Sequence, residues 1–304
     1  MIENIPRISV RIISYNQEEL ICRALDSLIA QRDYLYEVCI RDDCSTDLTY
    51  EVLLDYQRRY PDLIKVSRNE HNLGIFENIE VSWTLPTGDL IYTMAGDDAA
   101  GEGYFKAVVE FIKEKKIDWK NEFFCIYGDY MQISSDNTKT IFHQNLVNDK
   151  NAIKLLIRKL IGGRSACYSK KILEKFEKVS EGRSFRVELA QNCQLQLFSE
   201  HNYYLPALGN IYYAEIGISS RMSKADYVEN TIKGYDYFIN FVTNHGYQID
   251  KKDMAYIDYM KAYRNGNKKK ALKYYLKSID LSLGFKGLNL DRIFFVLKKK
   301  SRNK

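Results

Sequence analysis

Short apolar runs alternate with segments of helical periodicity along the first hundred residues. Runs rich in β-branched side chains predict four strands, at residues 8–13, 36–41, 63–66 and 90–94. One-sided apolar spacing predicts three helices between them, at residues 18–30, from 47 to just before Pro61, and from Phe76 to near Pro86. This β-α-β-α-β-α-β order predicts right-handed crossovers and a mostly parallel, Rossmann-like sheet flanked by helices.

Beyond residue 100 the pattern predicts a looser continuation. A helix at 104–115 and a strand at 123–127 are expected to extend the sheet. Further helices and two short strands are then predicted, the helices at 151–160, 170–176 and 187–199 and the strands at 203–205 and 211–214. From residue 225 onward we expect only helices, with an interruption at Gly266.

Two pairs of adjacent carboxylates follow predicted strands directly. Asp42-Asp43 comes after residues 36–41, and Asp97-Asp98 comes after residues 90–94. Parallel strands open into a ligand-binding crevice at their carboxyl ends, so both pairs are expected at one crevice. Carboxylate oxygens there suit a divalent cation that bridges to the phosphates of a nucleotide. The alternative is structural, because acids also occur at the start of a following helix.

The composition is that of an ordinary soluble globular protein. The 304 residues are 45% hydrophobic and 28% charged, and the length suits two domains or one large domain with an appendage. The first residues do not resemble a signal peptide, and no run of about 18 apolar residues occurs. Six cysteines without CxxC or zinc-like spacing are expected to be free thiols in a reducing cytoplasm.

Positive charge is concentrated at the C-terminal end. Residues 261–304 carry 14 Lys and Arg against two Asp, a net charge of +12, whereas the whole chain has +5. Residues 288–300 combine apolar bulk with a lysine cluster, which suits an anionic membrane surface, where each cation contributes about 1 kcal/mol. Solvated helices or another partner are the alternatives. No aromatic stacking module accompanies the charge, so nucleic acid is not expected.

Two common nucleotide-binding motifs are missing from the sequence. The first predicted strand leads into Ser14-Tyr15-Asn16-Gln17-Glu18, with neither GxGxxG nor GxxxxGK[ST]. A dinucleotide-binding protein and a P-loop ATPase are therefore not expected. A nucleotidyltransferase is disfavoured, because it usually has a glycine-rich, basic phosphate loop at this place.

The first hundred residues resemble the inverting nucleotide-sugar glycosyltransferases of family 2, whose fold is called GT-A. The matching stretches agree in order and spacing: residues 8–16, residues 41–47, Asn69, Asn72, Gly74, Asn78, and residues 88–98. Residues 262–275 separately resemble one unit of a tetratricopeptide helix pair. A single unit of that kind must pack on the rest of the protein or on a partner.

The family resemblance implies a role for several of these residues. It implies that Asp43 contacts the nucleobase; a carboxylate there favours uracil, whose N3–H is a donor. Asp98 is expected to bind Mn²⁺ or Mg²⁺, and Asp97 the ribose hydroxyls or the same metal, although the first acid of the family's Asp-x-Asp motif is missing. The other nucleotide-binding candidates on the matching stretches are Ser14, Asn16 and Asn72. Asp47 either belongs to this loop or caps the next helix.

The catalytic base is where the sequence departs from the family pattern. Family members usually have Glu-Asp-x-x-Leu at the start of a helix, and here Gln191 and Asn192 occupy the two acidic positions. Glu188, one helical turn earlier, is the candidate base. Its alternative is an exposed acid paired with Arg183 or Arg186. Residues 162–165 (Gly-Gly-Arg-Ser) are read as a loop near the acceptor, or as an ordinary turn.

The resemblance predicts a GT-A domain over residues 1–222, with a nucleotide-binding half (1–100) and an acceptor half (101–222). Residues 223–304 are predicted to form a helical, basic C-terminal extension. The expected activity is metal-dependent transfer from a UDP-sugar to a glycan or lipid-linked acceptor in cell-surface polysaccharide synthesis. The alternative is a catalytically degenerate domain that binds nucleotide sugars as a partner subunit. The expected location is the cytoplasm, or the inner face of the cell membrane through residues 285–304.

Overall fold

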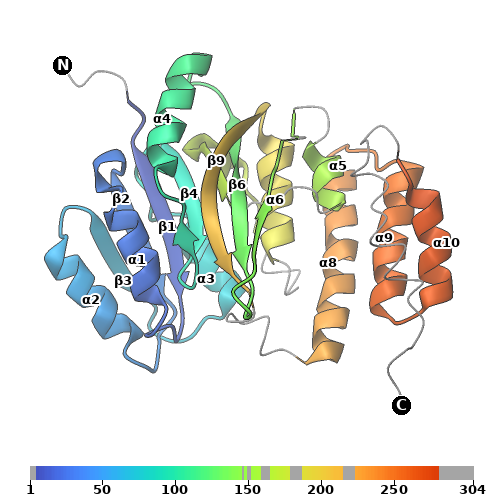
Figure 1. The fold of residues 1–304 in the computed structure, drawn as a ribbon, viewed down its shortest axis with the longest axis horizontal. Coiled ribbons are helices and arrows are strands. Elements are labelled where there is room, and N and C mark those ends of the chain that lie inside the picture. The colour runs from blue at the N-terminus through green and yellow to red at the C-terminus, as the bar shows by residue number, and fades with distance from the viewer. Residues whose placement is uncertain are drawn as a thin grey trace.

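One mixed sheet forms the centre of the molecule (Figure 1). The computed structural model describes residues 5–145, 147–148, 152–158, 165–178, 187–214 and 223–280. Within these residues, nine strands join in the order β3-β2-β1-β4-β8-β6-β9-β5, with β7 paired to β6. Their bounds are β1 Ile8–Ser14, β2 Glu37–Asp42, β3 Ile64–Arg68, β4 Leu90–Ala95, β5 Ala99–Ala100, β6 Phe124–Ile133, β7 Lys139–Phe142, β8 Ala166–Ser169 and β9 His201–Tyr213.

Helices cover both faces of this sheet. Their bounds are α1 Ile21–Ile29, α2 Thr49–Arg59, α3 Ile75–Ser82, α4 Tyr104–Lys115, α5 Ala152–Ile157, α6 Val187–Phe198, α8 Lys224–Asn244, α9 Lys251–Arg264 and α10 Lys268–Ser278. Figure 1 shows α8, α9 and α10 side by side at the end of the molecule away from α2. In the described segments, no helix is both long enough and apolar enough to cross a membrane.

The predicted parallel pairing describes the N-terminal half of the sheet. Strands β1, β2, β3 and β4 pair in parallel, as the alternation of strands and helices predicts. The other half is mixed: β8 pairs antiparallel with β4 and β6, β7 with β6, and β5 with β9, while β6 and β9 are parallel. Strand β8 lies between β4 and β6 and is antiparallel to both. A short strand between two others can pair with them in either direction.

Alternate residues of β1 contact different layers of the protein. Ile8, Val10 and Ile12 belong to a buried cluster with side chains of α1, α2 and α4. Arg11 and Ile13 lie on the opposite face, against α3. Successive strand side chains point to opposite faces, so a charged residue at position 11 lies beneath helices rather than in solvent.

The C-terminal helices share a hydrophobic cluster with the sheet. Tyr235, Tyr256 and Tyr275 of α8, α9 and α10 are buried in the same cluster as Tyr168 of β8. Helices α9 and α10 form a hairpin whose turn contains Gly266, with φ at +73°. The helix pair that resembles a tetratricopeptide unit therefore buries its apolar face on this protein itself.

Two expectations about the second half are corrected by the structure, and one strand was not predicted. The two short strands predicted at 203–205 and 211–214 are one continuous strand, β9, with an irregular register near Asp129 of β6. Strand β8 was not predicted, since four residues are too few to show alternation. The segment predicted to be helical from residue 225 is interrupted at 245–250 as well as at Gly266.

Candidate functional site

Both acidic pairs lie at the same edge of the sheet. Ser14, at the end of β1, is in register with Asp42 of β2, and Ile13 is in register with Ala95 of β4. Strand β1 therefore lies between β2 and β4, the two strands that lead into the acidic pairs. At a spacing of about 4.8 Å between neighbouring strands, the ends of β2 and β4 are about 10 Å apart. The two pairs thus lie at the same end of the parallel strands, as predicted, and the crevice that they were expected to share stays a prediction.

Asp42 organises the loop that follows β2. The residue is fully buried, and its carboxylate accepts hydrogen bonds from Ser14 Oγ at 3.3 Å, Ser45 Oγ at 2.5 Å and Ser45 N at 2.9 Å. Arg68 Nε lies 3.4 Å from the same carboxylate. Asp42 is thus a buried structural anion rather than a solvated loop acid. Ser14 supports this anion from the neighbouring strand.

Asp43 connects the end of β2 with the loop before α3. Its Oδ1 accepts from Asn69 Nδ2 at 2.7 Å and Leu73 N at 2.8 Å, and its Oδ2 accepts from Gly74 N at 2.9 Å. The side chain is 2% exposed. Because a carboxylate has about four acceptor positions, three bonds leave one for a further donor. Asn72 supports the same turn, since its Oδ1 also accepts from Gly74 N, at 2.9 Å.

Asn16 and Asp47 fix the loops around the end of β1. Asn16 has a positive φ of 50°, and its Oδ1 accepts from Thr46 N at 2.8 Å. Asp47 accepts from Thr49 N at 3.0 Å at the start of α2 and from Glu18 N at 3.2 Å. Asp47 thus precedes Leu48, the N-cap residue of α2, and its carboxylate connects the first N–H of that helix with the loop after β1.

Asp97 and Asp98 form a loop that is held from two sides. Asp98 is 3% exposed, and its N–H donates to Ala95 O at 3.2 Å. Arg23 of α1 donates to the carbonyl oxygen of Asp97 at 2.5 Å, while its guanidinium lies 3.4 Å from the ring centre of Tyr213. The next element is β5, not a helix, so the alternative that these acids begin the following helix is wrong.

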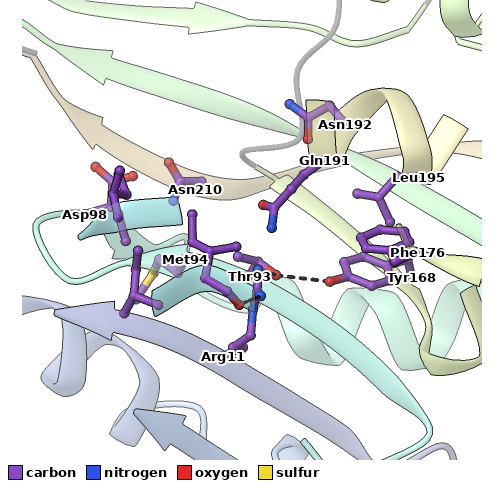
Figure 2. Close-up of a pocket in the computed structure, with 14 residues that line it drawn as sticks. Arg11, Thr93, Met94, Asp98, Tyr168, Phe176, Gln191, Asn192, Leu195 and Asn210 are labelled. Atoms are coloured by element: carbon purple, nitrogen blue, oxygen red, sulfur yellow. Dashed lines mark hydrogen bonds between the residues drawn. The ribbon is translucent and has the colours of Figure 1, made fainter. Parts of the chain in front are cut away.

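A cavity of about 150 Å³ extends from Asp98 beneath α6. Figure 2 shows Asp98 and Asn210 at one end of this group and Tyr168 and Phe176 at the other. Arg11 and Thr93 come from the adjacent strands β1 and β4. The polar groups thus lie along one cavity that begins at the second acidic pair.

The residues aligned with the family base lie on α6. Gln191 and Asn192 both line the cavity, where an acid pair was expected from the family pattern. Glu188 lies on the same helix one turn earlier, but its side chain is outside the described part of the structure. Residues 162–164, Arg183 and Arg186 also lie outside the described residues.

The carboxylates at the end of β4 suit a cation that arrives with phosphate. Over the described ranges, no group of three or more His, Cys, Asp or Glu forms a complete metal site. Mg²⁺ and similar cations are often held by one or two carboxylates, with phosphate oxygens and water completing the coordination shell. Asp97 and Asp98 can supply two carboxylates of such a coordination shell. A divalent ion therefore fits here only together with a bound molecule that supplies phosphate oxygens.

Two cavity residues were missed by the sequence reasoning. Tyr168 is 2% exposed, and its hydroxyl lies 3.2 Å from Thr93 Oγ1. Burial lowers the pKa of Arg11, while the nearby Tyr168 opposes the shift. Arg11 could have been noticed as a cation within the β-branched run 8–13. Tyr168 offered no signal, because its strand was not predicted.

Comparisons with known proteins identify the family. Residues 9–176, more than half of the chain, match the sequence pattern described as Glycosyl transferase family 2. An uncharacterized glycosyltransferase of Haemophilus influenzae is 28% identical over 131 residues, which cover 43% of this chain and 38% of that protein. Among the most similar curated relatives, the match covers 26% to 40% of their length, so the chain spans less than half of them.

Solved structures share the fold. TarS of S. aureus, residues 1–349 in complex with UDP-GlcNAc, superposes with a TM-score of 0.59 at 17% identity, covering 95% of this chain and 81% of that one. The mannosyltransferase PcManGT of Pyrobaculum calidifontis, in complex with GDP-Man and Mn²⁺, gives 0.56 at 14% identity, covering 98% and 82%. The sequence match, the predicted motifs and the shared GT-A-like architecture lead to one conclusion: this chain belongs to glycosyl transferase family 2.

Proposed function

We propose that this chain is a metal-dependent, inverting glycosyltransferase that uses a UDP-sugar. The observation that carries the proposal is the convergence of two acidic pairs on either side of the end of β1, with a cavity leading from the second pair beneath α6. A nucleotide at the first pair and a sugar in the cavity would then share one crevice. TarS, which binds UDP-GlcNAc, has a similar fold and supports a nucleotide-sugar donor.

Asp43 supplies the preference for uracil. Three of its acceptor positions hold the loop of residues 69–74, and the fourth can accept the N3–H of a uracil ring. Cytosine lacks this N–H, so a cytidine nucleotide would leave a buried carboxylate facing another acceptor. Ser14, Asn16 and Asn72 are the further proposed nucleotide-binding residues, and their hydrogen bonds hold the loops around Asp43.

Asp97 and Asp98 face the donor's ribose and diphosphate. In this proposal Asp98, together with Asp97, would hold Mn²⁺ or Mg²⁺, and Asp97 would also accept from the ribose hydroxyls. The cation supplies positive charge opposite the departing diphosphate, one of the recognised forms of metal catalysis. The Mn²⁺ in the PcManGT complex supports this choice of ion.

Transfer would proceed by direct displacement with inversion. A base removes the proton of an acceptor hydroxyl as its oxygen bonds to the anomeric carbon, and the bond to the diphosphate breaks, leaving UDP with the electron pair. Glu188 is the proposed base, since the amides of Gln191 and Asn192 cannot accept this proton. The proposed acceptor is a glycan or lipid-linked precursor of a cell-surface polysaccharide, reached at the inner face of the membrane.

Calorimetric titration with UDP, GDP and CMP, each with and without Mn²⁺, tests the donor class. We expect UDP alone to bind, and only with the metal. Asp98→Asn should reduce Mn²⁺-dependent UDP affinity at least tenfold, whereas Asp62→Asn, on an exposed loop, should leave it unchanged. Absence of binding by any nucleotide, or metal-independent binding by all three, would refute the proposal.

The second candidate is a degenerate nucleotide-sugar-binding subunit. The specific observation in its favour is that amides, Gln191 and Asn192, line the cavity where family members carry acids. Glu188→Gln distinguishes the two functions once a transfer assay exists. Loss of transfer with unchanged UDP affinity supports the enzyme, and a wild-type protein that binds UDP-sugars without transferring any of them supports the subunit.

A further inference from the structure

Arg11 is a buried cation on the wall of the cavity beneath α6. Its side chain is 3% exposed, at the centre of β1, and it is one of the cavity-lining residues. In the described part of the chain, no Asp or Glu forms an ion pair with it. A buried charge without a counter-ion is costly, so its presence requires an explanation.

The structural role of Arg11 explains only part of this arrangement. Its Nη1 donates to Ile79 O at 3.2 Å and to Ser82 Oγ at 3.2 Å, which holds the last turn of α3. A helix C-terminus carries only about half a negative charge, so these bonds compensate the cation partially. Nη2 reaches Thr93 Oγ1 at 3.4 Å, and Nε has no hydrogen-bond partner among the described residues.

The groups around Arg11 can complete an anion site. Tyr168 OH lies 3.2 Å from Thr93 Oγ1, and both hydroxyls can turn toward a ligand. Gln191 Nε2 is buried and has no partner in the described structure, and its residue lines the same cavity from α6. Figure 2 shows the end of Arg11 beside Thr93, with Gln191 across the cavity.

We propose that this cavity binds the carboxylate of an acidic sugar, such as a hexuronate, with Arg11 as its counter-ion. One guanidinium matches one negative charge, and its planar fork suits the two oxygens of a carboxylate. A phosphate group would bring up to two charges against a single cation. The apolar walls formed by Ile75, Phe176 and Leu195 suit the face of a sugar ring, not a second charged group.

The position of the cavity links the carboxylate to the transfer reaction. Asp98 and Asn192 line the same cavity as Arg11, so a sugar held by Arg11 would lie between the acidic pair and α6. This inference rests on the proposed function and specifies its substrate class. The carboxylate can belong to the transferred sugar or to the acceptor, and the same cavity chemistry applies to both.

Calorimetry with four probes tests this assignment. In the presence of Mn²⁺, UDP-glucuronate and UDP-glucose are compared, and glucuronate and inorganic phosphate are titrated into the protein saturated with UDP. If the donor carries the carboxylate, UDP-glucuronate should bind at least tenfold more tightly than UDP-glucose. If the acceptor carries it, glucuronate should bind to the UDP complex and the two donors should not differ.

Arg11→Met should abolish whichever of these effects is seen, while UDP affinity stays within twofold of wild type. Arg7→Met is the matched control, since Arg7 is half exposed and pairs with Asp89 outside the cavity. If Arg11→Met does not fold, Tyr168→Phe should weaken the carboxylate effect at least threefold.

Three results would overturn the assignment: UDP binding with no carboxylate effect, a carboxylate effect that survives Arg11→Met, or Arg11-dependent binding of phosphate in place of glucuronate. A protein that binds no UDP refutes the proposed function instead. In that case glucuronate titrated into the nucleotide-free protein decides whether the cavity is a carboxylate site.

Discussion

The Asp43 carboxylate holds a loop in the structure, and in the proposed function it also accepts a hydrogen bond from the nucleobase. Three of its hydrogen bonds fix the turn before α3, and they come from Asn69, Leu73 and Gly74. The loop therefore positions the carboxylate before any ligand arrives, which reduces the ordering that a nucleotide must impose on binding.

Replacing Asp43 with Asn should impair both roles. The amide nitrogen cannot accept a hydrogen bond, so at least one loop N–H loses its partner, and we expect the free energy of unfolding to fall by about 2 kcal/mol. Urea denaturation of Asp43→Asn and of the exposed control Asp62→Asn measures this difference. UDP affinity should decrease in the first variant only. Equal midpoints together with full UDP affinity would contradict the prediction.

The sequence indicates candidate site residues where they follow a recognisable strand. Asp43, Asp97 and Asp98 could be found because each pair comes directly after an apolar run, and the parallel topology then brings the pairs together. Arg11 was overlooked because the pattern of a strand indicates only that a position is buried. It does not indicate which groups surround a buried charge at that position. The side chain of Glu188 is outside the described structure, so its role as base stays a prediction.

Glu37 joins four strand regions at the start of β2. The carboxylate is fully buried and accepts from Ser9 Oγ of β1 at 2.7 Å, from Lys65 Nζ of β3 at 2.6 Å, and from Thr87 Oγ1 before β4 at 2.9 Å. Burial raises the pKa of Glu37, but these hydrogen bonds outweigh burial and lower the pKa to about 2. The folded parallel half of the sheet therefore stabilises the ionised form of the Glu37 carboxyl group.

This ion makes the stability of the parallel half acid-sensitive. A lowered pKa contributes stability above the ordinary value of 4.5, and the contribution is lost as the pH falls from there toward about 2. Glu37→Gln should reduce the free energy of unfolding by about 2 to 3 kcal/mol at pH 7, and by roughly 2 kcal/mol less at pH 3. Chemical denaturation at both pH values, with the exposed control Glu51→Gln, measures this. A pH-independent difference would disprove it.

Elements with an uninterrupted apolar pattern were predictable, whereas the four-residue strand β8 and the interrupted strand β9 were not predicted as they are. Strands β1, β2 and β4 and helices α1, α2 and α4 follow from periodicity, because each presents several turns or alternations. Strand β9 was predicted as two pieces, since Pro206 and Gly209 interrupt its apolar pattern although the strand continues through them. Whether a strand continues through such residues depends on its pairing with neighbouring strands. The linear pattern of apolar residues contains no information about this pairing.

A buried ionic network attaches the C-terminal helices to the rest of the molecule. Arg158, which follows α5, is 4% exposed and donates from Nε to Asp253 Oδ1 of α9 at 2.7 Å and from Nη1 to Ser278 O of α10 at 2.8 Å. Lys154 of α5 pairs with Asp280 beside them. These contacts cross from the predicted GT-A domain to the predicted extension, a boundary that stays a prediction.

Asp253→Asn should therefore destabilise the whole protein. The change leaves Arg158 buried without its counter-charge, and breaking such a pair costs about 3 to 5 kcal/mol. The double variant Arg158→Met/Asp253→Asn should recover at least 1 kcal/mol, because it removes both charges. Denaturation of both variants followed by near-UV and far-UV circular dichroism should give one coincident transition. Separate transitions would show that the helices unfold independently.

The basic C-terminal segment lies outside the described residues, and its membrane role is predicted from charge alone. Removal of residues 285–304 should weaken binding to vesicles that contain anionic lipids and leave UDP affinity unchanged. Sedimentation with anionic and with neutral vesicles measures the difference. Equal retention of the full and shortened proteins on anionic vesicles would exclude this role.

The place of β8 in the sheet has a consequence for synthesis on the ribosome. Strand β4 ends at Ala95, but its second neighbour, β8, begins only at Ala166, about seventy residues later. At translation rates of about 5–20 residues per second, this interval lasts roughly 4–14 s. During that time a finished parallel half would expose an open, apolar strand edge, the kind of surface on which chains pair with one another. The growing chain should therefore depend on chaperones until β8 emerges, and a fragment that ends near residue 100 should self-associate.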